Sequence, residues 1–96
     1  MRLVYFIYIL YSEKLNRFYV GTTDDIARRI EEHNNAFYSS SFTVNGIPWI
    51  LKLSFECQSS EKAYKIERFI KKMKSKVFIE KIIANDTILK DVQDKF

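Results

Sequence analysis

Apolar residues in the first half of the chain are spaced as in β-strands. Residues 3–11 run Leu-Val-Tyr-Phe-Ile-Tyr-Ile-Leu-Tyr without a charged position, and such aromatic and β-branched residues favour strands. Both faces of this strand are apolar, which is typical of a central strand covered on both sides. Residues 18–20, Phe-Tyr-Val, are strand-like again, so the chain begins with two strands close together.

Polar residues between these two strands predict a β-hairpin. With the loop at residues 12–15, Tyr11 pairs with Asn16, and Tyr8 faces Tyr19 across the hairpin. The pattern alone leaves the register open, because a slip of one residue turns every side chain to the other face of the sheet.

A helix is predicted next, from about Asp25 to Asn34. Hydroxyl and carboxylate side chains at residues 22–25 are suited to capping its start, and two isoleucines four residues apart lie on one of its faces. Residues 35–47 are then irregular, with serines, an Asn-Gly pair and a following proline.

The second half predicts one strand and further helices. In the strand at residues 49–56, alternation places four apolar side chains on one face: Trp49, Leu51, Leu53 and Phe55. A helix from residue 61 to about residue 74, capped by Ser59 or Ser60, has a buried stripe made of Ala63, Ile66, Ile70 and Met73. A third helix begins near Ser75, and the last ten residues form a short helix or a frayed end. The predicted class is α+β, a three-stranded antiparallel β-sheet flanked by helices in the order β-β-α-β-α-α.

Size and composition predict one domain over residues 1–96, with 47% hydrophobic residues, two glycines and one proline. The single cysteine, Cys57, excludes an internal disulfide and a cysteine metal cluster, and we expect it to fill space at the end of a strand. The apolar start lacks the small-residue cleavage site of a signal peptide and is too short to span a bilayer as a helix. We therefore expect a cytoplasmic protein without membrane association.

Positive charge is concentrated in the second half of the chain. The net charge is +4, and residues 49–96 hold eleven basic against seven acidic residues, whereas residues 1–48 hold five of each. A basic face of this kind suits phosphate groups. Solvated lysine-rich helices that bind nothing have a similar composition, so charge alone does not establish the partner.

Two tripeptides in the predicted hairpin carry a resemblance. Phe6-Ile7-Tyr8 followed by Tyr19-Val20-Gly21 is similar to the paired signature of the GIY-YIG nuclease superfamily, although the first tripeptide has no glycine. Arg29, His33 and a glutamate in a later lysine-rich helix continue the pattern over residues 3 to about 83. The chain most resembles the small standalone bacterial members, which are similar to the amino-terminal incision domain of the excinuclease C subunit.

Arg29 and His33 are four residues apart and so lie on one side of a helix, one turn from each other. An arginine presents a fixed fork of donors that matches phosphate oxygens. The resemblance implies that Arg29 holds the scissile phosphate and stabilises its charge in the transition state. The alternative is an exposed arginine beside a surface histidine, the commoner situation for such a pair.

Tyr8 and Tyr19 are candidates for the proton chemistry, although a strand tyrosine is ordinarily a core aromatic. The resemblance implies that Tyr8 is the general base for the attacking water, assisted by His33, and that Tyr19 positions the phosphate or shares the proton network. A phenol titrates near pH ~10, so it needs nearby cations such as Arg29 to act as a base. Which tyrosine has which task stays open.

Glu67 is the glutamate that the resemblance implies as ligand of a single Mg²⁺ or Mn²⁺ ion. Mg²⁺ commonly takes one or two carboxylates and fills its other positions with water and phosphate oxygens. The alternative is a helical salt bridge with Lys71, four residues further on.

The resulting hypothesis is a metal-dependent endonuclease that hydrolyses phosphodiester bonds, with DNA as the expected nucleic acid. We expect no small-molecule cofactor, and a monomer or a homodimer. The alternative is a nucleic-acid-binding module on the same scaffold with little or no catalysis. The expected contacts to the nucleic-acid backbone come from the end of the second strand and from the lysine-rich helix: Gly21, Thr22, Lys65, Arg68, Lys71 and Lys72.

Overall fold

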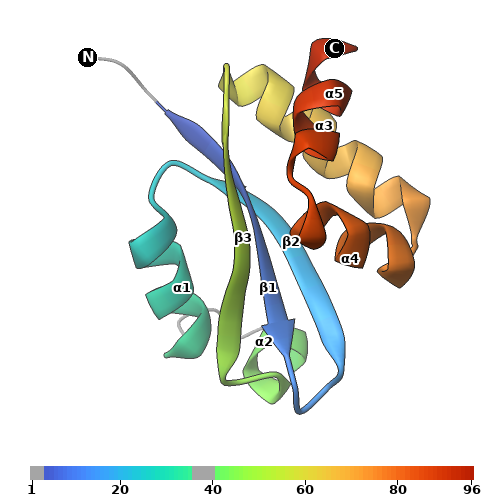
Figure 1. The fold of residues 1–96 in the computed structure, drawn as a ribbon. Coiled ribbons are helices and arrows are strands. Elements are labelled where there is room, and N and C mark those ends of the chain that lie inside the picture. Colours follow the sequence, from blue (N-terminus) through green and yellow to red (C-terminus); the bar gives the residue numbers. More distant parts are fainter. Residues whose placement is uncertain (1–3, 36–40) are drawn as a thin grey trace.

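A computed structural model of the chain describes residues 4–35 and 41–96 (Figure 1). The first residue of the predicted first strand and the middle of the stretch expected to be irregular lie outside these ranges. Three strands form one antiparallel sheet in the order β2-β1-β3, where β1 is Tyr5–Ser12, β2 is Arg17–Thr23 and β3 is Trp49–Cys57. The helices are α1 (Ile26–Asn34), α2 (Ser41–Asn45), α3 (Ser60–Met73), α4 (Lys76–Ala84) and α5 (Thr87–Asp94). The predicted fold class is confirmed.

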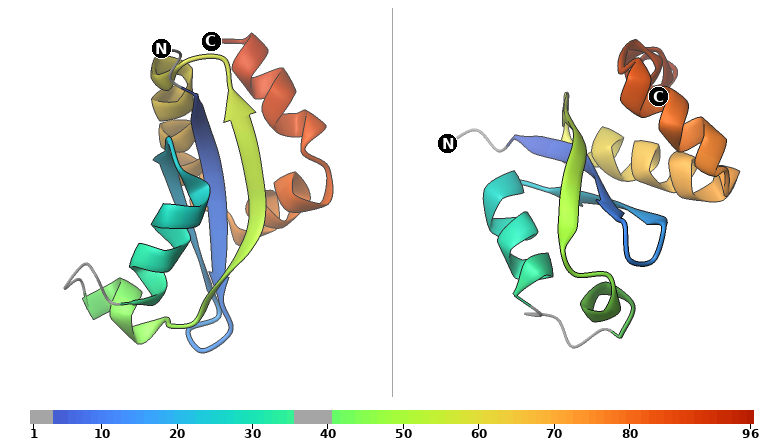
Figure 2. Two further views of the ribbon diagram at one scale, coloured as in Figure 1. Left: turned by 90° about the vertical axis from the view of Figure 1, so that its left-hand side faces the viewer. Right: turned by 60° about the horizontal axis from the view of Figure 1, so that its bottom comes forward.

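Helices cover both faces of the sheet, with β1 in its centre (Figure 2). α1 and α2 lie on one face, called here the α1 face; α3, α4 and α5 lie on the other, called the α3 face. Ile7 and Ile9 of β1 point to the α3 face, and Tyr8 and Leu10 point to the α1 face. The prediction of a central strand covered on both sides is therefore confirmed. No helix in the described part of the chain is long and apolar enough to cross a membrane.

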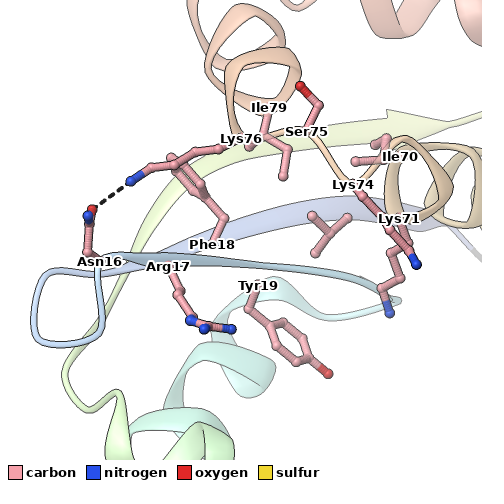
Figure 3. Close-up of a pocket in the computed structure, with 11 residues that line it drawn as sticks. Asn16, Arg17, Phe18, Tyr19, Ile70, Lys71, Lys74, Ser75, Lys76 and Ile79 are labelled. Carbon is pink, nitrogen blue, oxygen red and sulfur yellow. Dashed lines mark hydrogen bonds between the residues drawn. The ribbon is translucent and has the colours of Figure 1, made fainter.

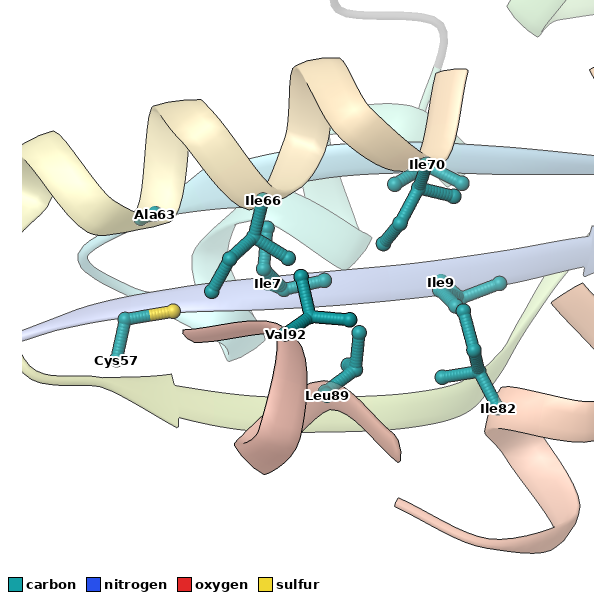
Figure 4. Close-up of a cluster of buried hydrophobic side chains, with 10 residues drawn as sticks. Ile7, Ile9, Cys57, Ala63, Ile66, Ile70, Ile82, Leu89 and Val92 are labelled. Atoms are coloured by element: carbon teal, nitrogen blue, oxygen red, sulfur yellow. The ribbon is translucent and has the colours of Figure 1, made fainter. Parts of the chain in front are cut away.

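The α3 face holds the larger hydrophobic core (Figure 4). Its buried members are aliphatic apart from one cysteine: Ile7, Ile9, Val20, Cys57, Ala63, Ile66, Ile70, Ile82, Leu89 and Val92. Complete burial of a side chain such as isoleucine stabilises a fold by about 2 kcal/mol, so this cluster is the main source of stability. Cys57 ends β3 here as a small apolar residue, as expected, and burial raises the pKa of its thiol to about 11.

The hairpin register differs from the expected one. Tyr8 pairs with Gly21 and not with Tyr19. Tyr11 likewise does not pair with Asn16, because Asn16 belongs to the turn, where it adopts a positive φ of 52° that asparagine tolerates better than most residues. The pairing shifts by two residues, which keeps the side chains on their expected faces but places a glycine opposite the Tyr8 ring.

β3 also departs from the expected alternation. A register shift opposite Ile9 and Leu10 pairs Leu53 with Ile9 and Leu51 with Leu10. Trp49 consequently packs with the cluster on the α1 face, whereas Leu53 packs on the α3 face. The prediction that four alternate apolar residues share one face is wrong, because an extra residue in a strand reverses the faces on one side of the bulge.

Helix boundaries follow the expected caps. The Asp25 carboxylate caps α1, and the Ser59 hydroxyl caps α3. Two other expectations are wrong: residues 41–45 form α2 within the stretch expected to be irregular, and Met73 is 47% exposed and not buried. Met73 is the last residue of α3, and the chain changes direction at the left-handed residue Lys74 directly after it, so its side chain lies beyond the core-facing stripe.

Candidate active site

Tyr8 lies at the centre of a polar cluster on the α1 face. Its side chain is 1% exposed, and its hydroxyl oxygen is 3.0 Å from Arg29 Nε and 3.2 Å from His33 Nε2. Arg29 and His33 come from the same side of α1, as their spacing predicts. His33 is only 3% exposed, so the pair faces the sheet and is not an exposed surface pair.

The direction of each hydrogen bond follows from the groups present. The Arg29 Nε–H only donates, so the Tyr8 oxygen accepts from it. Burial, followed by the nearby charge of Arg29, lowers the pKa of His33 to about 4, so its imidazole is neutral near pH 7. We infer that the Tyr8 hydroxyl donates to His33 Nε2 and that the imidazole proton lies on Nδ1.

The same surroundings keep the Tyr8 phenol protonated. Burial raises the pKa of Tyr8 to about 12, and the hydrogen bond from Arg29 acts in the opposite direction. The nearby Tyr19 and the carboxylate of Glu67 also raise this pKa through their charge. Tyr8 can therefore take up a proton only if it passes its own proton on, and His33 Nε2 is the acceptor within hydrogen-bond distance.

Gly21 leaves the space that the Tyr8 ring occupies. A Cβ at position 21 would lie 2.6 Å from Tyr8 Cζ and closer still to the hydroxyl oxygen. A side chain there would displace the hydroxyl from Arg29 and His33. The sequence suggested Gly21 as a nucleic-acid contact, but Gly21 is buried against the Tyr8 ring. A glycine is needed here because Gly21 pairs with Tyr8, which is true only in the observed register.

Aromatic rings pack around the cluster and hold His33 in place. Tyr19 stacks beside Tyr8 with ring centroids 6.2 Å apart, and its edge contacts the His33 ring at a centroid distance of 4.7 Å. Trp49 contacts Tyr19 at 6.1 Å, and its indole Nε1 donates to the Thr43 carbonyl at 2.7 Å. These rings limit the rotation of the imidazole and shield one side of Tyr8 from water.

Glu67 reaches the cluster from the opposite face of the sheet. Its Oε1 is 3.5 Å from Thr22 Oγ1, and its Oε2 is 2.7 Å from Lys71 Nζ. The alternative of a salt bridge with Lys71 is thus observed. Lys71, which pairs with Glu67, has its Nζ 5.8 Å from the centre of the Tyr19 ring across the outer strand β2, and the charge of Glu67 is the smallest of the causes that act on the pKa of Tyr8. The site therefore extends around the edge of β2.

Glu67 could hold a metal ion whose remaining ligands are water and oxygens of the substrate. In residues 4–35 and 41–96, no group of three or more His, Cys, Asp or Glu side chains is placed to hold a metal. A single carboxylate is nevertheless sufficient for Mg²⁺ or Mn²⁺ when water and phosphate oxygens supply the remaining ligands. The salt bridge to Lys71 does not prevent this, because the lysine is half-exposed and such pairs contribute only ~0–1 kcal/mol.

The other expected nucleic-acid contacts divide into two groups. Lys71 lies at the site, with its Nζ 5.8 Å from the centre of the Tyr19 ring. Lys65 and Lys72 instead line a hollow elsewhere on α3, so the structure does not bring them to Tyr8. Arg68 lines that hollow too, and it also lines a second one together with Glu67 and Lys71. Lys65 and Lys72 extend the positive surface away from the cluster.

Glu32 is a neighbour of the site that was not predicted from the sequence. Its Oε1 is 3.5 Å from Arg29 Nη1, which gives the guanidinium a second partner besides Tyr8. A spacing of three residues along a helix predicts such a pair, so the sequence contained the information.

The structure thus brings Tyr8, Arg29 and His33 together on the α1 face, with Glu67 across the edge of β2. The family model described as the GIY-YIG catalytic domain matches residues 4–81. This match covers most of the chain, and the protein therefore belongs to the GIY-YIG family. No curated protein and no solved structure matched the chain.

Proposed function

We propose that the protein is a metal-dependent endonuclease that hydrolyses phosphodiester bonds, with DNA as its substrate. The observation that carries the proposal is the hydrogen-bonded group of Tyr8, Arg29 and His33, to which Glu67 is electrostatically coupled around the edge of β2. Within the family, we place the protein with the small standalone bacterial members that resemble the excinuclease C incision domain. The sequence resemblance supports this finer placement.

Tyr8 and His33 together move the proton of the attacking water. As the water attacks phosphorus, the Tyr8 oxygen takes its proton while the phenolic proton passes to His33 Nε2, 3.2 Å away. The hydrogen bond from Arg29 stabilises negative charge that develops on the Tyr8 oxygen during this transfer. With a pKa of about 4, the imidazolium that forms is more acidic than an ordinary histidine and does not keep the proton near pH 7.

Arg29 holds the phosphate beside this proton path. Its guanidinium is oriented by Tyr8 and by Glu32, so its planar set of donors is already positioned when the substrate arrives. Tyr19, stacked beside Tyr8 and close to Lys71, forms the opposite wall of the site and positions the phosphate.

Glu67 holds the divalent cation in this proposal, and Thr22 orients its carboxylate. A bound Mg²⁺ or Mn²⁺ supplies positive charge that stabilises the oxygen of the leaving group. In this proposal Lys71, whose side chain is half-exposed, would leave Glu67 and pair with a phosphate of the substrate.

The test is a cleavage assay on supercoiled plasmid and on duplex, branched and single-stranded oligonucleotides, in Mg²⁺, Mn²⁺ or EDTA. Arg29→Ala is compared with Arg28→Ala, which removes the same group one position away, where it pairs with Asp24 on the surface. Glu67→Gln is compared with Glu61→Gln, which breaks a salt bridge of the same helical spacing. We expect the Arg29 and Glu67 variants to cut at least ~10²-fold more slowly and both controls to cut like the wild type.

Two results would contradict the proposal. Equal activity of the Glu67 and Glu61 variants would remove Glu67 from the metal site. Wild type that binds nucleic acid in a salt-dependent way but cuts none of these substrates in either metal would be a binding module on a nuclease scaffold.

A further inference from the structure

A groove of about 430 Å³ follows the outer edge of β2, away from Tyr8 and toward the hairpin turn (Figure 3). One wall is β2 itself, and the other is the end of α3 with the start of α4. Arg17 and Tyr19 point to one side of β2, whereas Lys74 and Lys76 lie on its other side, at the end of α3 and the start of α4 (Figure 3). The groove therefore extends around the edge of this strand. Lys76 lies near the turn, where its Nζ is 2.7 Å from Asn16 Oδ1.

The groove is lined by cations and by the apolar side chains of Phe18, Val20, Ile70 and Ile79. Four of its eleven lining residues are Arg or Lys, and none is acidic. Lys71 pairs with Glu67, but within the described part of the chain neither Arg17 nor Lys74 forms an ion pair with a carboxylate. Their charge is available to an anionic ligand that lies in the groove.

Two of these lysines occupy positions that helix chemistry disfavours. Lys74 is the left-handed C-cap of α3, with φ 48°, where glycine or asparagine is preferred. Lys76 is in the first turn of α4, which has no acidic residue, although the positive end of a helix favours carboxylates. Proteins depart from local rules of this kind mainly at functional sites.

We propose that this groove holds the sugar-phosphate backbone of the cut strand, on one side only of the scissile phosphate. The inference rests on the proposed nuclease function, because the groove shares Tyr19 and Lys71 with the active site. Arg17 and Tyr19 are two residues apart on one strand, or ~7 Å, which equals the axial rise of about two nucleotides. Arg17, Lys74 and Lys76 therefore contact phosphates next to the one that is cut.

Direct binding tests the groove without any cleavage. Fluorescence anisotropy in EDTA, at several salt concentrations, compares Arg17→Gln/Lys74→Gly with Lys81→Gln/Lys90→Gln, which removes two exposed charges outside the groove. We expect the groove variant to bind labelled DNA at least ~10-fold more weakly and to lower the salt slope by about 2, one for each phosphate contact. The control variant binds within about 2-fold of wild type.

The single substitution Lys74→Gly also separates an effect on binding from an effect on folding. Glycine fits the left-handed conformation of Lys74 better than lysine does, so the single variant Lys74→Gly melts at the same or a higher temperature than wild type while it binds DNA more weakly. Equal binding by the groove variant and the charge-matched control would overturn the proposal. A Lys74→Gly variant that keeps wild-type affinity would remove Lys74 from the groove contacts.

Cleavage of shortened DNA substrates tests whether the groove contacts the cut strand on one side only of the scissile phosphate. We expect wild type to cut slowly when the strand is shortened to one nucleotide on one side of the scissile phosphate, and to tolerate shortening on the other. The groove variant cuts both kinds of trimmed substrate at similar, reduced rates. Wild type that cuts but tolerates shortening on both sides overturns the groove alone, whereas wild type that neither binds nor cuts any nucleic acid overturns the proposed function as well.

Discussion

The sheet has an aliphatic core on its α3 face and a smaller, mixed cluster on its α1 face. The first is built from isoleucine, leucine, valine and alanine of six elements. The second buries Tyr8, Leu10 and Trp49 together with polar groups of His33 and Thr43. Buried polar groups add stability only when they are hydrogen-bonded, and here the Tyr8 hydroxyl is hydrogen-bonded to Arg29 and to His33 Nε2 in a geometry that suits proton transfer.

The difference between the faces suggests a division of tasks. The α3 face stabilises the fold, and the α1 face holds the groups proposed to react. Glu67, Lys71 and the cationic groove lie where the two faces meet, along the outer edge of β2. An outer strand that contains a glycine near its end allows both sides of the sheet to contribute to one site.

Removal of the Tyr8 hydroxyl should have the largest effect on activity. Tyr8→Phe keeps the ring but loses the proton path between water and His33, so we expect cleavage to fall ~10²–10⁴-fold and the free energy of unfolding to fall by only about 1 kcal/mol. Tyr19→Phe keeps the ring contacts to Tyr8 and His33 and should cost less than ~10-fold. Single-turnover cleavage rates measure both, and a greater loss in the Tyr19 variant would reverse the assignment of the base.

Truncation in the aliphatic core should give the opposite pattern. Ile66 is completely buried on the α3 face, so Ile66→Ala should lower the free energy of unfolding by ~2–5 kcal/mol without changing the cleavage rate per folded molecule. Urea unfolding measures the first quantity. Val77→Ala, at an exposed position of α4, is the control and should change stability by less than ~0.5 kcal/mol. A large loss of activity in folded Ile66→Ala would show that the two faces are not separable.

Gly21→Ala should affect both properties. The added Cβ overlaps the Tyr8 ring, so we expect a loss of ~1–3 kcal/mol in stability and about 10²-fold in cleavage, because the hydroxyl moves away from Arg29. Tyr8→Phe removes the atom nearest the new methyl group and should partly restore the stability of Gly21→Ala. A double-mutant cycle by urea unfolding measures this coupling, and additive effects would contradict the close approach of the two residues.

Acid should destabilise the α1 face through His33. Its pKa is about 4 in the folded protein against an ordinary value of 6.5, so between these values the unfolded chain binds more protons. The free energy of unfolding should therefore fall by ~1–3 kcal/mol as the pH is lowered from about 6.5 to about 4. His33 is the only histidine of the chain, so His33→Gln should remove this dependence above pH ~5. An unchanged pH profile in that variant would contradict the burial of a neutral His33.

Much of the fold was predictable because it depends on neighbours in the sequence. Helix caps at Asp25 and Ser59 use side chains within three residues of the groups they bind. The Arg29–His33 pair follows from helical spacing in the same way. The candidate reacting groups were named from the resemblance of two tripeptides, and the structure brings Tyr8, Arg29 and His33 into contact.

The sequence by itself determined the three strands, the helices other than α2, which strand is central, and which residue types are available for chemistry. Only the tertiary structure decided the pairing of Tyr8 with Gly21, the bulge that turns Trp49 to the α1 face, and the position of Glu67 at the edge of β2. It also brought Arg17 to the lysines at the junction of α3 and α4. These features depend on how distant segments pack against one another, whereas alternation and helical spacing describe only the local chain.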